Sequence, residues 1–157
     1  MKNHSSKGKS EKNVSVSRVI PAQRSEIFGV LANPFLHAEI DGSGTVRGKI
    51  RGPDQLCLGD TFKIKMKTWN IPYRITNTVV EYEKDTLIAW SHFGKHRWRY
   101  QLSDGPDGTV VTETFDWAEA IWPKMIELCG YPSSHIPCMD ETLELSLIHI
   151  SEPTRPY

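Results

Sequence analysis

The chain has 157 residues, of which 38% are hydrophobic, and equal numbers of acidic and basic side chains give it a formal net charge of zero. This length predicts a single domain with one core, of roughly 130 residues, and excludes a second domain. Four lysines against one glutamate in residues 1–12 leave the remaining chain mildly acidic, which argues against nucleic acid as the main partner.

Residues 1–12 are rich in serine, lysine, asparagine and glycine. We expect a disordered N-terminal tail there, because the stretch lacks the apolar centre of a signal peptide. No apolar run approaches the roughly 20 residues of a membrane span, so none is predicted. Cys57, Cys129 and Cys138 match no zinc-ligand spacing, which predicts reduced thiols in a cytoplasmic protein.

The globular domain is predicted to begin with a strand and two short helices. Residues 14–20 alternate between apolar and polar side chains, an imperfect strand signal that ends at Pro21. Ile27 and Phe28 belong to the apolar face of a short helix, which Asn33-Pro34 ends because the residue before a proline avoids the helical region. A second helical turn over residues 35–40 then leads into a glycine-rich turn.

From residue 45 to residue 117 the sequence predicts successive antiparallel strands joined by short turns. Phe62, Ile64 and Met66 alternate with polar side chains, which is the clearest inside/outside pattern in the chain. One face of the sheet is therefore expected to carry large apolar and aromatic groups, and the other charges and threonines. Such a bent sheet encloses either a packed core or a ligand cavity, and the pattern does not separate the two.

An apolar stripe near the C-terminus predicts the helix that covers this inner face. Its first part, residues 121–129, carries apolar residues at helical spacing and stops at Gly130. Its second part, residues 133–144, repeats apolar side chains at the same spacing, namely Ile136, Met139 and Leu143.

Residues 145–155 abandon this stripe. Their sequence, LSLIHISEPTR, resembles in one reading frame the translation of a transposon adapter used in sequencing libraries. Such scars are excluded from fold reasoning. We therefore expect residues 145–157 to be a non-native tail and residues 13–144 to be the natural domain, with its closing helix cut short.

Short stretches spread over residues 13–144 carry a resemblance to a known family. They are Val16–Ala22, Ile27-Phe28, His37–Gly48, Tyr73, Asn77–Glu81, Ala89-Trp90, Arg97–Tyr100, Val111–Trp117, Gly130-Tyr131-Pro132 and Thr142-Leu143. In these stretches the chain resembles bacterial proteins of the polyketide cyclase/dehydrase and lipid-transport family, part of the START-like (SRPBCC) superfamily. The resemblance implies an α+β helix-grip fold: a curved seven-stranded antiparallel sheet around a C-terminal helix, with two short helices after the first strand.

The same resemblance implies a cavity for a small hydrophobic ligand, lipid-like or polyketide-like, between the sheet and the C-terminal helix. The expected ligand-binding side chains are Phe62, Ile64, Met66, Tyr73, Asn77, Trp90, Trp98, Tyr100, Phe115, Trp117, Trp122 and Met125. Binding or transport of such a ligand is the first expectation. The second is a cyclase, dehydratase or isomerase that acts on it, and the fold alone does not choose between them.

Glu113 is the candidate catalytic residue of the second expectation. It shares the parity of Phe115 and Trp117, so its carboxylate should enter apolar surroundings, where desolvation would raise its pKa and suit it to proton transfer. The plainer alternative is that an inward polar side chain pairs with it or that a bulge turns it outward. Asn77 and Glu81 share a parity on an earlier strand and are the neighbours to consider.

Other polar residues are expected to be structural. His92 and His96 are separated by a turn, which favours exposed hairpin histidines over metal ligands. His37 is expected to cap or form a turn. The glycines form no phosphate-binding, dinucleotide-binding or methyltransferase motif, so no cofactor and no metal are expected.

Overall fold

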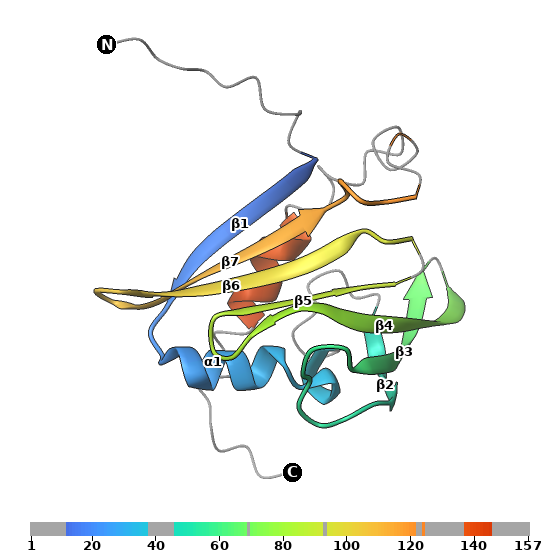
Figure 1. Ribbon diagram of the computed structural model, residues 1–157, viewed down its shortest axis with the longest axis horizontal. Helices are drawn as coiled ribbons and strands as arrows, with labels where there is room; N and C mark the ends of the chain where they lie inside the picture. Colours follow the sequence, from blue (N-terminus) through green and yellow to red (C-terminus); the bar gives the residue numbers. More distant parts are fainter. Residues whose placement is uncertain are drawn as a thin grey trace.

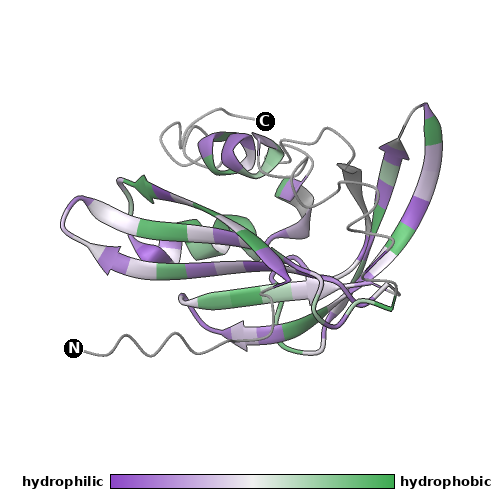
Figure 2. Cartoon of the chain, turned by 90° about the horizontal axis from the view of Figure 1, so that it is seen from above, coloured by the Kyte–Doolittle hydropathy of each residue, from purple (hydrophilic) through white to green (hydrophobic). Residues whose placement is uncertain are grey.

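The computed structural model describes residues 12–37, 46–68, 70–92, 94–121, 124 and 137–145. These residues form one antiparallel sheet in the strand order β1-β7-β6-β5-β4-β3-β2, together with short helical segments (Figure 1). The sheet curves around the helix of residues 137–145 (Figure 2). The α+β class is thus confirmed.

The elements follow one another along the chain with short connections. The strands are β1 (Asn13–Ile20), β2 (Val46–Arg51), β3 (Thr61–Thr68), β4 (Ile71–Glu83), β5 (Leu87–Ser91), β6 (Arg97–Gly105) and β7 (Gly108–Asp116). Between the first two strands lie the helix α1 (Arg24–Leu31) and the 3-10 turn η1 (Pro34–Leu36), so the two short helices after the first strand are confirmed.

Alternation of side chains decides which face of each strand is buried. On β3, Phe62 and Ile64 are buried, whereas Lys65 and Lys67 are exposed, as the period of two requires. On β4 this alternation is interrupted by a bulge between Val79 and Glu81. The extra residue shifts the alternation by one position. Residues with the same parity before and after the bulge therefore point to opposite faces of the sheet.

The first and last strands along the chain, β1 and β7, are neighbours in the sheet. β1 pairs with β7 from Asn13 opposite Asp116 to Ile20 opposite Thr109. On the outer face, hydroxyl groups join the two strands across distances of 2.8 Å, namely Ser15–Thr114 and Ser17–Thr112. This pairing makes β1 one edge of an open sheet, whose other edge is β2.

The helix of residues 137–145 packs against the inner face with one apolar side. Leu143 belongs to the main core cluster, and Met139, one turn earlier, packs with Phe115 and Trp117 in a second cluster. Arg18 of β1 adds ion pairs to Asp140 at 3.6 Å and to Glu144 at 3.7 Å. Because these pairs are partly exposed, the apolar contacts hold the helix more than the charges do.

Several predicted features lie outside the described residues. They are the helix of residues 121–129 apart from Ile121 and Lys124, the glycine-rich turn at 41–44, the N-terminal tail up to residue 11, and residues 146–157. Leu145, assigned to the tail from the sequence, ends the described helix and packs against the core. None of the helices formed by the described residues combines the length and the apolar character needed to cross a bilayer.

Two glycines provide a test of this fold. Gly108 has a φ of +135°, and a Cβ added there would overlap the carbonyl oxygen of Ile20. The variant Gly108→Ala should therefore lower the free energy of unfolding by at least about 2 kcal/mol. Gly29 lies inside α1 with no atom within 4 Å of an added Cβ, so Gly29→Ala should raise it by about 0.5–1 kcal/mol. Urea unfolding measures both, and an unchanged Gly108→Ala protein would contradict the close packing of β7 on β1.

Candidate functional site

The inner face of the sheet brings most of the predicted ligand-binding residues together. Phe62, Ile64, Asn77, Tyr100, Phe115 and Trp117 are buried there, and Met66, Trp90 and Trp98 are half-buried. The strand register aligns them in rows, because Phe115 lies opposite Trp98 and Trp98 lies opposite Trp90. The predicted Trp122 and Met125 lie outside the described residues.

Glu113 lies in the middle of this face, where the alternation of β7 predicts it. The residue is 2% exposed and stands between Val16 of β1 and Tyr100 of β6. The Tyr100 hydroxyl donates a hydrogen bond of 3.0 Å to the Glu113 Oε1. A buried carboxyl group beside a phenol can orient a polar group of a ligand, and it can also take up or deliver a proton.

Aromatic rings continue from Tyr100 across the inner face. The centroids of Tyr100 and Trp90 lie 5.4 Å apart, and Trp90 stacks on His37 at 4.8 Å with an interplanar angle of 23°. Phe62 meets both Trp90 and His37 edge-on. These contacts have the geometry that favours aromatic pairs, and they make one wall of the inner face.

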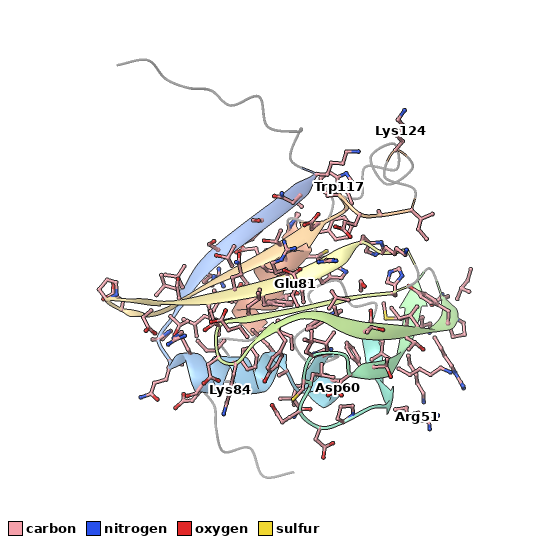
Figure 3. All side chains as sticks on the ribbon, in the orientation of Figure 1. Arg51, Asp60, Glu81, Lys84, Trp117 and Lys124 are labelled. Atoms are coloured by element: carbon pink, nitrogen blue, oxygen red, sulfur yellow. The ribbon has the colours of Figure 1, made fainter. Side chains whose placement is uncertain are left out.

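A second group of rings surrounds the other end of the same face. Phe115 lies 4.8 Å from Trp98, 5.8 Å from Trp117 and 5.3 Å from His96, measured between ring centroids. Trp117 follows the end of β7 (Figure 3). Met139 of the helix packs against this group, so the helix covers this end of the inner face.

Tyr73 lies apart from these rings, whereas its partner Met66 packs against the main core cluster. The two residues oppose each other near the free end of the β3–β4 hairpin, where Tyr73 is 40% exposed. The prediction grouped Tyr73 with the aromatic ligand-binding residues of the inner face. Parity gives the face of a residue but not its distance from the core, and the hairpin extends beyond the core at this point (Figure 1).

Glu81 is the residue that the alternation misplaces. The bulge after Val79 moves it to the outer face, so it cannot be a neighbour of Glu113, whereas Asn77 before the bulge stays on the inner face. On the outer face Glu81 accepts hydrogen bonds from Arg97 at 3.1 Å and from Arg99 at 2.8 Å (Figure 3). Arg99 also donates to Asp116 at 3.2 Å.

This ion cluster controls the protonation of Glu81. Burial by itself raises the pKa of the carboxyl group, but the hydrogen bonds and charges of Arg99 and Arg97 outweigh it and hold the pKa below its usual value. Ala89 separates Glu81 from Arg99 in the strand register and is fully buried beneath them. Ion pairs therefore stabilise the outer face of the sheet, and apolar contacts stabilise the inner face.

Two histidine assignments are tested by the structure. His92 and His96 were expected to be exposed, which is wrong: both are half-buried, and their ring centroids lie 4.1 Å apart. Burial lowers the pKa of His92, so its neutral form is favoured in the folded protein. Within the described ranges, no group of three or more histidine, cysteine, aspartate or glutamate side chains could hold a metal ion.

His37 has the expected structural role and also a second position that the sequence did not reveal. Its Nε2 donates to the carbonyl oxygen of Leu31, the last residue of α1, at 2.9 Å. The ring is buried against Trp90 and Phe62, so it forms part of the aromatic wall. Periodicity could not find it because it lies in a connection, and the signal pointing to it was the family-like stretch His37–Gly48.

The comparisons with known proteins identify uncharacterized relatives. Protein Rv0088 of Mycobacterium tuberculosis strain H37Rv is 42% identical over 135 residues, which are 83% of this chain and 60% of that protein. Protein MT0096 of strain CDC 1551 matches with the same identity and coverage. The chain thus spans about 60% of the length of the curated relatives it matches. No family model matches it.

Solved structures share the fold at low sequence identity. A protein of Nitrosomonas europaea has a TM-score of 0.71 at 12% identity, covering 92% of this chain and 97% of its own. A protein of Rhodobacter sphaeroides reaches 0.70 at 14% identity, covering 95% and 97%. The AHSA1-like protein of Aeromonas hydrophila reaches 0.61 at 17% identity, covering 92% and 97%. The fold is therefore one found in several bacterial proteins.

Substitutions of Tyr100 test how closely the inner face is packed. Tyr100→Ala should lower the free energy of unfolding by about 3–5 kcal/mol if the ring is part of a packed core. Tyr100→Phe, which removes the hydrogen bond to Glu113, should lower it by about 1–3 kcal/mol. Tyr73→Ala on the same face is the exposed control, with an expected loss near 1 kcal/mol. Equal losses for Tyr100→Ala and Tyr73→Ala would mean that Tyr100 borders open space.

The ion cluster of Glu81, Arg97 and Arg99 on the outer face makes the stability of the protein depend on pH. The folded pKa of Glu81 lies below its value of 4.5 in the unfolded chain, so its contribution is present above that pH and is lost as the pH falls through the folded pKa. Glu81→Gln should therefore reduce the difference in unfolding free energy between neutral pH and about pH 3. Glu83→Gln, an exposed change on the same strand, is the control. Parallel pH profiles for Glu81→Gln and the parent would refute the assignment.

Proposed function

We propose that this protein belongs to the polyketide cyclase/dehydrase and lipid-transport family and binds a small hydrophobic or aromatic molecule between its sheet and the helix of residues 137–145. The observation that carries the proposal is the pair formed by Glu113 and Tyr100 on an aromatic face. Ligand sites combine apolar walls with a few polar groups in this way. The helix covers the concave face of the sheet that carries this pair, which supports a site between the two (Figure 2).

The pair of Glu113 and Tyr100 is informative because burying its polar groups costs free energy of folding. A carboxyl group and a phenol that are removed from water lose hydration worth several kcal/mol, and their mutual hydrogen bond restores part of it. Two apolar side chains would fill the same volume without this cost. The pair is therefore explained better by recognition of a ligand than by stability.

The surrounding residues define the chemistry of the ligand. Trp90, Trp98 and Phe115 offer ring faces and edges to a flat or branched apolar body. Glu113 and Tyr100 offer an acceptor and a hydroxyl group to one polar substituent. A molecule with an apolar skeleton and one hydroxyl or keto group satisfies both requirements, and no cofactor is part of the proposal.

Titration with a panel of lipids, aromatic polyketides and isoprenoids tests this function through tryptophan fluorescence. One class should bind saturably, and Tyr100→Phe should weaken its hydroxylated members about 5- to 10-fold through the loss of one hydrogen bond. The control Thr112→Val removes a hydroxyl on the outer face and should leave binding unchanged. Absence of saturable binding, or equal effects of both variants, would refute the site.

The second candidate function is catalysis on the same molecule. It is favoured by the position of Glu113, which is buried and within hydrogen-bond distance of a phenol that can relay or replace its proton. A cyclisation, dehydration or isomerisation includes a proton-transfer step that such a carboxyl group can assist, while the bonds that form or break and any water released belong to the substrate. Under this second candidate function, the variant Glu113→Gln should retain ligand binding and lower turnover about 100- to 10,000-fold. Binding by both forms without any product favours the carrier.

A further inference from the structure

The β3–β4 hairpin carries different chemistry on its two faces. The strands pair from Thr61 opposite Thr78 to Thr68 opposite Ile71, so the parity of every residue on them is known. Toward the free end the inner parity holds mainly apolar residues, namely Ile64, Met66, Ile71, Tyr73 and Ile75, with Thr68 opposite Ile71. The outer parity holds four cations, namely Lys63, Lys65, Lys67 and Arg74.

The apolar residues become more exposed toward the end of the hairpin. Ile64 is buried, Met66 is half-buried, Tyr73 is 40% exposed, and Ile71 at the end is 64% exposed. Met66 and Tyr73 also line a hollow of about 420 Å³. The other residues that line it are Pro72 and the cations Lys65, Lys67 and Arg74. An apolar strip that continues from the core into solvent beside positive charge is suited to a partner that is itself half apolar.

The charge of the hairpin is unbalanced. No aspartate or glutamate occurs between residues 61 and 80, although the whole chain is neutral. Lys65, Lys67 and Arg74 are exposed. The ion pairs recorded for the described residues are made by other cations, namely Arg18, Arg24, Arg97 and Arg99. The hairpin charges are therefore directed at solvent, where an anionic partner can approach them.

We propose that the end of the β3–β4 hairpin docks on an anionic lipid bilayer. Ile71 and Tyr73 would enter the boundary between head groups and acyl chains, where an aliphatic side chain loses its contact with water and a tyrosine keeps its hydroxyl hydrated. The lysines would lie at the level of the anionic head groups, their long stems against the apolar boundary. Duplex nucleic acid fits less well, because it offers phosphates but no partner for an exposed isoleucine.

This inference goes beyond ligand binding and does not depend on it. Docking needs no molecule between the sheet and the helix, and it is measured on vesicles alone. In Figure 1 the hairpin projects from one side of the sheet, away from the β6–β7 turn.

Co-sedimentation of the full chain with two kinds of vesicle tests the proposal. Vesicles of phosphatidylcholine with phosphatidylserine should bind the protein, and vesicles of phosphatidylcholine alone should bind it far more weakly, as should the anionic vesicles at high salt. The double variant Lys65→Gln/Lys67→Gln should partition about 25-fold more weakly, at about fivefold for each cation. Ile71→Ser should weaken binding about fivefold or more at unchanged charge.

Matched changes elsewhere on the surface are the controls. Lys84→Gln/Lys124→Gln removes the same charge at sites away from the hairpin (Figure 3). Leu58→Ser removes an apolar side chain that is 62% exposed, close to the value for Ile71. The proposal is overturned if the parent does not bind anionic vesicles or if the controls weaken binding as much as the hairpin variants. Tighter binding to a duplex DNA, lost in the double lysine variant, would also overturn it.

Discussion

The pairing of the first strand with the last is the constraint on which the rest of this structure depends. β7 lies between β1 and β6, so the row that contains Glu113 is complete only when β1 has joined the sheet. The hydroxyl partners on these two strands are separated by 95 and 99 residues of chain. Closing so long a loop lowers the entropy before any contact compensates for it, so the inner face should form late and as a unit.

Alternation of side chains was sufficient to predict the inner face over much of the sheet. On β3, β6 and β7 the period of two places Phe62, Tyr100 and Glu113 correctly, because these strands run without a bulge among the described residues. The same rule failed for Glu81, because a bulge inserts one residue without any mark in the sequence that a period of two can detect. It also could not place His37, which lies in a connection.

The inner and outer faces of the sheet are stabilised by different interactions. On the inner face, aromatic rings and the helix pack over a sheet that buries the hydrogen-bonded pair of Glu113 and Tyr100. On the outer face, charges and hydroxyl groups connect β1, β4, β6 and β7. Such a network on the outer face would help the proposed ligand site to keep its geometry on binding, as preorganised recognition requires.

Ala89 shows how this network restricts its surroundings. Glu81 and Arg99 belong to strands that are not neighbours, and their side chains meet across β5 because the residue between them ends at its Cβ. Position 89 is thus limited in size by electrostatics and not by the packing of the core. A valine or leucine there would suit a strand and bury apolar area, yet it would stand between the carboxylate and the guanidinium. The smallest side chain on the strand is the one that lets charge span three strands.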